Sequence, residues 1–409
     1  GRDTLDLQGE YAARSMEIDA GDGRNDITLT GRYRIANAFT IRGGSGNDTL
    51  LDFRTGGGAA SPTDITAGSL SIDLGGGTNT VRLSGTYATP TGAITIRTGA
   101  GNDTIDLQGS YTARSLSVEA GAGTNDLTLT GRYLITEAFT ITTEGGTDTL
   151  TDLRAASGAV ETADIQARSL AIRLGDGDNT TTLVGRYAID EAFSLTGGAG
   201  ADRLTDHRLV GGAVTNAVQL VAATVTITLG DGQNHVELAG SHEAKGTYTL
   251  TTGAGDDTVV DAALVSGALV QGATIRAADI AVNLGAGDNA LTLLGTTIAT
   301  STLALTSLGG LDRFALRGRV RAAATTIRLG AGDDILDLAV REISGQTSVF
   351  GEDGADTINV DRMPSLTSTT AARTDTLDID GGQDTDTIRV QLNGASSYRI
   401  NVKDSGSPD

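Results

Sequence analysis

The chain has 409 residues, 57 glycines, no cysteine, no tryptophan and a formal net charge of −21. Its length would suggest about two or three globular domains, but aromatic residues make up only 3% of it, too few for conventional cores of that size. The absence of cysteine excludes thiol catalysis, and no apolar run of about 18 residues is present to span a membrane. The acidic balance argues against nucleic acid and membrane partners and favours divalent cations.

A long internal repeat organises the first half of the chain. Residues 1–100 align with residues 101–200 without a gap: GRDTLDLQGEYAARS at 1–15 matches GNDTIDLQGSYTARS at 101–115. Residues 201–395 continue the pattern in diverged form, and 396–409 lose it. We therefore predict one continuous repeat array over 1–395, followed by a terminal strand and linker over 396–409.

A shorter repeat lies inside the long one, marked by a Gly-x-Gly-x-Asp/Asn turn. About 16 such turns follow at intervals of about 22–24 residues, or about 30–32 where a polar loop such as 54–64 is inserted. We call the Asp/Asn position of each turn the slot. In chain order the slot residues are Asp3, Asn25, Asp48, Asn79, Asp103, Asn125, Asp148, Asn179, Asp202, Asn234, Asp257, Asn289, Asp312, Asp334, Asp356 and Asp386.

Apolar residues alternate on both sides of each turn. Ile27 and Leu29 follow the slot at Asn25, and Met16 and Ile18 precede the glycines of the same turn. A period of two predicts strands with one buried face. One unit is too short to bury that face alone, whereas stacked units can. The predicted fold class is all-β: a parallel β-solenoid, of the β-roll or β-helix kind, with about 16 stacked rungs of about 22–32 residues.

Two coil geometries are compatible with this pattern. Each unit could form one full coil, or two units could share a coil with Asp turns on one edge and Asn turns on the other. The near-strict alternation of Asp and Asn up to Asp312 favours two units per coil. The series Asp312, Asp334 and Asp356 breaks the alternation without breaking the spacing, and we favour one unit per coil.

The turns combine residues with two kinds of chemistry. Glycine supplies backbone conformations with positive φ and allows close approach of neighbouring turns, and stacked Asn or Asp side chains can form a purely structural ladder. Alternatively, Ca²⁺ takes six to eight oxygens from carboxylates and carbonyls, which such turns expose. The expected turn-forming glycines are Gly43, Gly44, Gly46, Gly99, Gly101, Gly198, Gly200, Gly253, Gly255, Gly330 and Gly332. The ladder candidates are Asn25, Asn79, Asn125, Asn179, Asn234 and Asn289.

The segment GGSGNDTLL at 43–51 resembles GGxGxDxUx, the RTX or hemolysin-type calcium-binding repeat, with Gly43, Gly44, Gly46, Asp48 and Leu50 in the motif positions. The resemblance implies a parallel β-roll with Ca²⁺ between the turns of neighbouring coils, and export by Gram-negative bacteria. This chain departs from the family's direct tandem arrangement, and six of its sixteen slots carry neutral Asn. The calcium-ligand candidates that the resemblance implies are Asp48, Asp103, Asp148, Asp202, Asp257, Asp312, Asp334 and Asp356.

The remaining chemical signals are weak. A recurring [LVI]xGxY pattern is typical of aromatic stacks at a solenoid corner, with a sugar-binding tyrosine stripe as the alternative; its tyrosines are Tyr11, Tyr33, Tyr87, Tyr111, Tyr133 and Tyr187. His207, His235 and His242 have no metal-binding spacing and are expected at the surface. The polar residues follow the period almost everywhere, whereas an active site needs a non-repeating cluster, so we predict that the protein is not an enzyme.

Together these signals predict an extracellular structural protein. We expect a secreted or cell-surface bacterial repeat region: a calcium-stabilised rod that serves as stalk, filament or surface-layer component of an adhesin-like protein. Its expected partners are other copies of itself or the rest of a longer array, and surface polysaccharide. The alternatives are a carbohydrate-binding or polysaccharide-active β-helix and a metal-free filament held by Asn/Asp ladders.

Overall fold

A computed structural model describes residues 1–53, 63–156, 159–363, 375–392 and 398–403. The described residues form strands, turns and bends without a helix, and so they contain no helix that is long and apolar enough to span a membrane. The chain divides into two compact units, Gly1–Gly198 and Ala199–Asp409, and each unit is described by itself. The loop expected over 54–64 and the linker expected after residue 403 lie largely outside the described residues.

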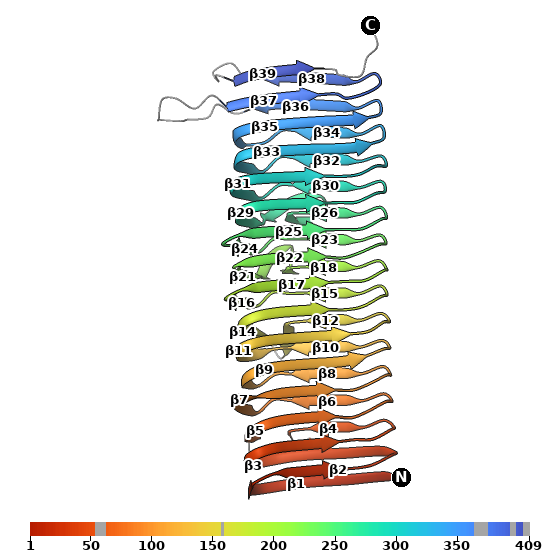
Figure 1. The fold of residues 1–409 in the computed structure, drawn as a ribbon, viewed down its shortest axis with the longest axis vertical. Helices are drawn as coiled ribbons and strands as arrows, with labels where there is room; N and C mark the ends of the chain where they lie inside the picture. Colours follow the sequence, from red (N-terminus) through yellow and green to blue (C-terminus); the bar gives the residue numbers. More distant parts are fainter. Residues whose placement is uncertain (54–62, 157–158, 364–374, 393–397, 404–409) are drawn as a thin grey trace. The chain divides into compact units, whose positions relative to one another are not determined.

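Unit 1 is an all-β stack in which long and short strands follow each other along the chain (Figure 1). Its strands are β1 (Arg2–Ala13), β2 (Met16–Asp19), β3 (Arg24–Arg42), β4 (Thr49–Leu51), β5 (Asp64–Asp73), β6 (Thr80–Leu83), β7 (Thr86–Arg97), β8 (Thr104–Leu107), β9 (Ser110–Gly121), β10 (Asp126–Leu129), β11 (Gly131–Thr143), β12 (Thr149–Thr151), β13 (Leu153–Ala156), β14 (Ala159–Arg173), β15 (Thr180–Thr182), β16 (Arg186–Ile189) and β17 (Ala192–Thr196).

Unit 2 repeats this plan. Its strands are β18 (Arg203–Thr205), β19 (His207–Val210), β20 (Ala213–Ala217), β21 (Gln219–Ala222), β22 (Thr224–Thr228), β23 (His235–Glu237), β24 (Ser241–Ala244), β25 (Thr247–Thr251), β26 (Thr258–Val260), β27 (Ala262–Val265), β28 (Ala268–Gly272), β29 (Thr274–Asn283), β30 (Ala290–Leu293), β31 (Thr296–Thr306), β32 (Arg313–Leu316), β33 (Arg319–Ala331), β34 (Ile335–Leu338), β35 (Glu342–Asp353), β36 (Thr357–Met363), β37 (Asp375–Asp380), β38 (Thr387–Leu392) and β39 (Tyr398–Lys403). The terminal strand expected after residue 395 is β39, which pairs in parallel with β37.

The strand register shows that each repeat unit is one complete coil. In unit 1, the residue two positions after the slot pairs with its counterpart in the next unit, so that Ile27 pairs with Leu50 and Leu50 with Val81. In unit 2, Val259 pairs with Leu291 in the same way. All these pairings are parallel. The parallel β-solenoid is thus confirmed with one unit per coil, the alternative of two units per coil is wrong, and Asp and Asn turns share one column within each unit.

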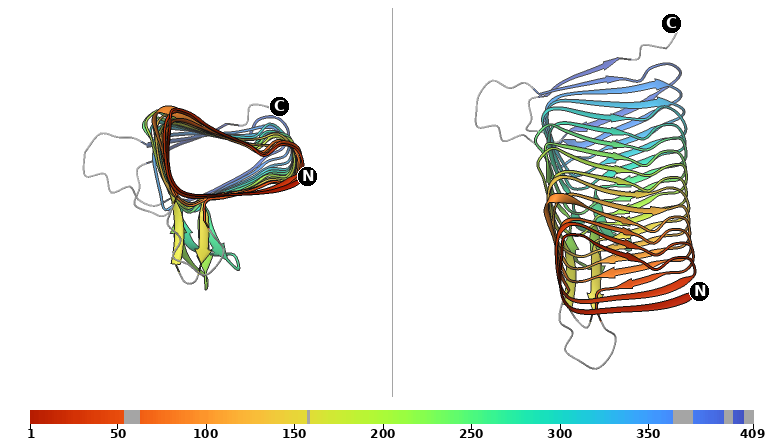
Figure 2. Two further views of the ribbon diagram at one scale, coloured as in Figure 1. Left: turned by 90° about the horizontal axis from the view of Figure 1, so that it is seen from below. Right: turned by 60° about the horizontal axis from the view of Figure 1, so that its bottom comes forward.

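The interior of each coil is filled by the alternating apolar residues. Ile27, Leu29, Phe39 and Ile41 are almost fully buried in one coil of unit 1, and burying each such side chain stabilises the fold by about 1.5–3 kcal/mol. Viewed along the stack, the coils of unit 1 trace a closed outline around this core (Figure 2). Stacking therefore buries apolar side chains that a single unit could not bury alone.

Among the described residues, three hairpin arms leave this regular path. In unit 1, β13 pairs antiparallel with the start of β14. In unit 2, β19 pairs with β20 and β27 with β28, each as a separate two-stranded sheet. The arms project outside the closed outline of the coils (Figure 2). Each arm occupies one of the long repeat intervals, so the extra residues extend the surface and leave the coil unchanged.

Candidate functional site

The slot residues form a hydrogen-bonded ladder from coil to coil. In unit 1 the backbone N–H of Asn25 donates to Oδ1 of Asp48, and the N–H of Asp48 donates to Oδ1 of Asn79. The same link continues through Asp103, Asn125 and Asp148 to Asn179, with donor–acceptor distances of 2.7 to 3.1 Å throughout. Asp and Asn thus play one shared role, in which the side-chain oxygen accepts the amide of the preceding coil.

Unit 2 carries the same ladder. It runs from Asp202 through Asn234, Asp257, Asn289, Asp312, Asp334 and Asp356 to Asp386, again at 2.7 to 3.1 Å. The slot residues from Asn25 to Asn179 and from Asp202 to Asp356 are at most 3% exposed. An unpaired buried amide would cost about 1–3 kcal/mol, so each ladder bond holds the turn at its place in the stack.

Asn and Asp slots differ in the second terminal atom of the side chain, which is Nδ2 in Asn and Oδ2 in Asp. Nδ2 of Asn79 donates to the carbonyl oxygens of Gly75 and Gly77 in its own turn, at 3.0 and 3.2 Å. Asn25, Asn125, Asn179 and Asn234 repeat this double contact with their own turns. A carboxylate has no proton to donate there. The Asn turns are therefore internally satisfied, and the Asp turns are not.

In the Asp turns a carboxylate oxygen is buried without a hydrogen-bond partner. This holds for Oδ2 of Asp48, Asp148, Asp334 and Asp356. Burial raises the pKa of Asp103 and Asp356 to about 6 and that of Asp334 to about 7. Burial also raises the pKa of Asp48, Asp257 and Asp312. At Asp334 and Asp356 a proton or a cation would satisfy the unpartnered second oxygen.

These residues fit a calcium ion. The unpartnered carboxylate oxygens are hard ligands of the kind that calcium takes. Among the described residues no three acidic or histidine side chains come close enough to hold a metal by themselves, so backbone carbonyls would complete the coordination. The best candidates are Asp312, Asp334 and Asp356, because there carboxylates follow each other on successive coils.

The expected turn glycines serve two purposes. Gly46 has φ of 134°, and a Cβ atom there would lie 2.1 Å from the carbonyl oxygen of Gly23 in the preceding coil. Gly43 lacks a positive φ, but a Cβ atom there would lie 2.4 Å from Oδ2 of Asp48. Positive φ also occurs at Gly44, Gly99, Gly101, Gly200, Gly255, Gly330 and Gly332, whereas Gly198 and Gly253 permit close approach only.

A second set of buried carboxylates was missed by the sequence analysis. Asp52, Asp152, Asp206 and Asp261 are at most 2% exposed and stand four residues after a slot, at the base of a long interval. The carboxylate of Asp152 accepts the N–H groups of Val184 and Gly185 in the next coil and the hydroxyl of Tyr187, each at 2.6 Å. Its backbone carbonyl accepts the N–H of Ala163, which closes the arm. We call these four residues the anchor aspartates.

The other anchor aspartates repeat this arrangement with a changing third donor. Asp52 accepts the hydroxyl of Tyr87 at 2.6 Å, and Asp206 is bonded to Nε2 of His242 at 2.7 Å. Asp261 accepts two backbone amides, and burial raises its pKa to about 7. Burial opposes ionisation of Asp206 too, but its bonds with His207 and His242 hold its pKa below the ordinary value. The sequence signal was an Asp four residues after the slot, followed by a long interval.

The tyrosines lie inside the coils. Tyr87, Tyr111 and Tyr133 stack with ring centroids 5.0 Å apart and nearly parallel planes, and Tyr33, Tyr87, Tyr111, Tyr133 and Tyr187 are at most 2% exposed. The hydroxyls of Tyr111 and Tyr133 donate to Leu83 and Leu107 in the coils below. The expected aromatic stack is present, and these five side chains cannot form a sugar-binding stripe facing solvent.

The expectation of surface histidines is wrong for two of the three. His207 and His242 are at most 4% exposed, and Glu237 lies between His207 and His235 at 3.5 and 3.8 Å. The coil register brings His235 and His242 to the base of the β19–β20 arm, where His207 follows Asp206. His207 and His242 contact the anchor Asp206 in place of the tyrosine that serves Asp52 and Asp152.

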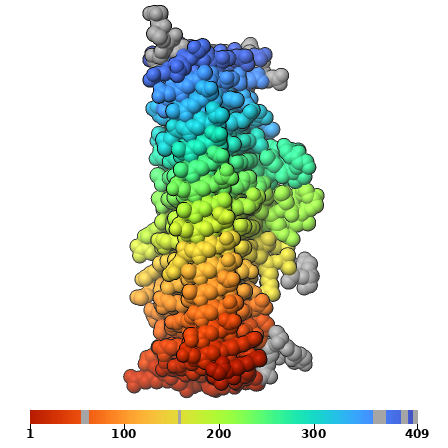
Figure 3. Space-filling model, turned by 90° about the vertical axis from the view of Figure 1, so that its right-hand side faces the viewer, coloured from red at the N-terminus to blue at the C-terminus, as the bar shows by residue number. Residues whose placement is uncertain are grey.

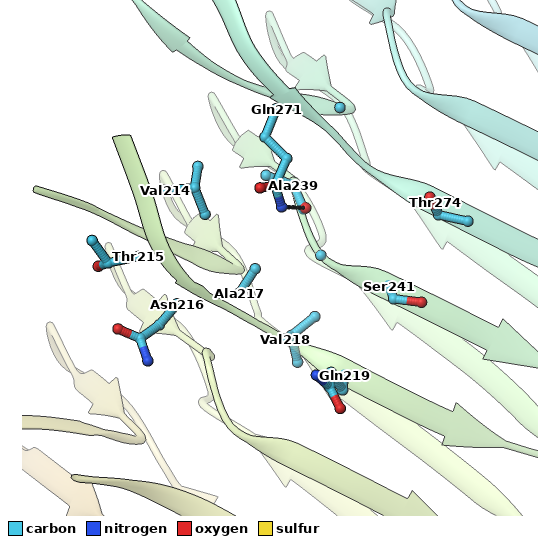
Figure 4. Close-up of a pocket in the computed structure, with 12 residues that line it drawn as sticks. Val214, Thr215, Asn216, Ala217, Val218, Gln219, Ala239, Ser241, Gln271 and Thr274 are labelled. Carbon is cyan, nitrogen blue, oxygen red and sulfur yellow. Dashed lines mark hydrogen bonds between the residues drawn. The ribbon is translucent and has the colours of Figure 1, made fainter. Parts of the chain in front are cut away.

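A cleft lies beside this region, between the two arms of unit 2 and the coil wall. It has a volume of about 480 Å³ and is lined by Val214–Gln219, Ala239–Ser241, Gln271, Gly272 and Thr274 (Figure 4). Gln271 of β28 donates to the carbonyl oxygen of Ala239 at 2.6 Å, which ties the arm to the wall. The cleft lining contains no charged residue.

The chain matches no family model, no curated protein and no solved structure.

Proposed function

We propose that this protein is a non-enzymatic structural repeat region of a secreted or cell-surface bacterial protein, with calcium as the ion that stabilises its turns. One observation carries the proposal: the buried ladder of slot residues, which repeats on successive coils within each unit. The hydrogen-bonding groups of these side chains link successive coils and so make the stack rigid. They are therefore not available to bind a substrate.

The remaining buried polar chemistry supports the same role. The anchor aspartates accept backbone amides of the next coil, and the buried tyrosine hydroxyls donate to backbone carbonyls. On the outer surface, arginines pair with carboxylates on the neighbouring coil, as Arg97 does with Glu119 at 2.7 Å and Arg321 with Glu342 at 2.7 Å. Nearly all of these interactions run along the stack, as a stalk, filament or surface layer of an adhesin-like protein would need.

Calcium would couple the folding of this structural region to its export. A bound Ca²⁺ would neutralise the buried carboxylates of Asp312, Asp334 and Asp356, and turn carbonyls would complete its coordination. Because a ligand that binds only the folded state adds to its stability, the chain would remain weakly folded at the low calcium concentration of a cytosol. Outside the cell, where calcium is abundant, the coils would close. Folding would then be coupled to export.

Thermal unfolding followed by circular dichroism tests the proposal. With calcium we expect the melting temperature to rise by about 10 °C or more over that in EDTA, saturably and without the same response to magnesium. The triple variant Asp312→Asn, Asp334→Asn and Asp356→Asn converts the run of Asp turns into Asn turns. We expect it to fold in EDTA and to lose most of the calcium response.

A different result would point to the metal-free filament. If neither calcium nor EDTA changes the melting temperature of the unaltered chain, calcium plays no part, and the ladder alone holds the turns. If the triple variant keeps the full calcium response, the ion binds elsewhere than at these three slots.

A further inference from the structure

The arms of unit 2 differ from the wall that carries them. The segment 262–272, AALVSGALVQG, contains no charged residue, although charged residues make up 20% of the chain and its net charge is −21. In β28 the exposed fractions of Leu269 and Val270 are 42% and 38%, and in β19 those of Leu209 and Val210 are 38% and 46%. The arms therefore present aliphatic side chains to solvent from an acidic support.

These arms are hairpins with well-defined turns. Ser266 and Gly267 have φ of 50° and 77°, and Gly211 and Gly212 have φ of 59° and 82°. Positive φ at both central residues is the signature of a type I′ turn, whose twist matches that of the strands it joins. Gln271 and the anchor aspartates fix the bases of the arms. The aliphatic residues are therefore held in place by defined turns and bases.

The strands of the arms have free edges. Among the described residues, β27 and β28 pair only with each other, as do β19 and β20. A two-stranded hairpin is marginal by itself, and an unpaired edge without charge or proline is a template for a further strand. The sequences of both arms lack the lysine and proline that usually protect such an edge. An additional strand is thus the ligand that this surface fits.

The two arms of unit 2 also lie close to each other. Within unit 2 the two arms contact each other through β20 and β28, and Cγ1 of Val265 lies 4.0 Å from the position that a Cβ atom on Gly212 would take. The two arms project next to each other in the space-filling view (Figure 3). Arms of this chain therefore already pack against arms of this chain.

We propose that the β27–β28 arm is a docking surface for a second copy of this chain, by pairing of the outer edge of β28 with its counterpart in the partner. Two equal edges can pair antiparallel about a twofold axis, so each copy supplies the same residues. The charge distribution favours the arm as the contact site. Two acidic chains repel each other where their surfaces are charged, and the surface of this arm is uncharged. The association extends the proposed structural function to lateral contact between copies, but it does not depend on calcium in the turns.

Sedimentation velocity over about a hundredfold range of protein concentration tests this inference, in calcium and in EDTA. We expect a reversible monomer–dimer equilibrium in the unaltered chain. The double variant Leu269→Gln and Val270→Gln should weaken the dimer about tenfold or more, with an unchanged circular dichroism spectrum. The matched control is Leu308→Gln with Leu311→Gln, which replaces two even more exposed leucines in a turn of unit 2 and should leave the dimer intact.

Two results would overturn the proposal, and a third would separate it from the calcium proposal. A chain that remains monomeric at every concentration has no self-docking surface, and the arm then serves a different polypeptide. Equal weakening by both double variants would show non-specific association of exposed leucines. Dimerisation that persists in EDTA while the melting temperature shows no calcium response would refute the calcium proposal and leave this one standing.

Discussion

Replacing Asp152 by alanine is expected to destabilise unit 1 by about 3–5 kcal/mol. The carboxylate accepts the N–H groups of Val184 and Gly185 and the hydroxyl of Tyr187. Its removal leaves three buried donors without an acceptor, and water does not reach them, because Asp152 and Tyr187 are at most 2% exposed. Urea unfolding measures the loss, and hydrogen exchange of peptides that cover 180–190 locates it.

The matched control is Asp126→Ala, which removes an exposed carboxylate from the same unit and should change the stability by less than about 0.5 kcal/mol. Tyr187→Phe should fall between the two variants, at about 1 kcal/mol, because both backbone amides keep their acceptor. If Asp152→Ala costs no more than the control, the anchor aspartates are not what joins an arm-bearing coil to the next one.

The fold was predictable because the spacing of the repeat in the sequence matches the pairing of its strands. Ile27, Leu50 and Val81 stand two residues after their slots, and the same spacing that marks them in sequence pairs them in space. A column of equivalent residues needs only a constant register, which the Gly-x-Gly-x-Asp/Asn turns supply. The inward position of Tyr87 and Tyr111 follows from the same alternation of buried and exposed positions.

The candidate site was predictable only in part, because two features depend on neighbouring coils. The slot position was visible, but Oδ1 of Asp48 accepts an amide from Asn25 in another coil, and no local motif records such a contact. The anchor aspartates recur only at the start of long repeat intervals, so they are absent from the regular period. His207 is next to Asp206 in the sequence, but His242 reaches Asp206 only because the register places it on the next coil.

The pH dependence of stability in EDTA is expected to be opposite to that of most acidic proteins. Burial raises the pKa of Asp103 and Asp356 to about 6 and that of Asp334 to about 7, whereas an unfolded Asp titrates at about 3.9. A raised pKa means that the folded state binds protons more tightly than the unfolded state. The stabilisation is therefore fully present below about pH 4 and is lost as the pH rises through about 6 to 7.

Asp334→Asn should remove part of this dependence. The amide keeps the acceptor for the N–H of Asp312 and gains a donor for the turn carbonyls, as Asn79 has. At pH 8 in EDTA we expect the variant to be more stable than the unaltered chain by about 1–2 kcal/mol, and about equally stable at pH 4. The control is Glu243→Gln, which removes an exposed negative charge from a strand of unit 2 and should leave the slope unchanged.

Calcium should reverse the sign of this slope. The ion binds ionised carboxylates, so its stabilisation grows as the protons leave Asp334 and Asp356. The unaltered chain should then lose stability with rising pH in EDTA and gain it with rising pH in calcium, as measured by urea unfolding at pH 4 to 8. A falling slope under both conditions would mean that protons alone satisfy the slots. A flat profile in EDTA, or an Asp334→Asn variant that is less stable at pH 8, would contradict the buried, protonated carboxyl on which this argument rests.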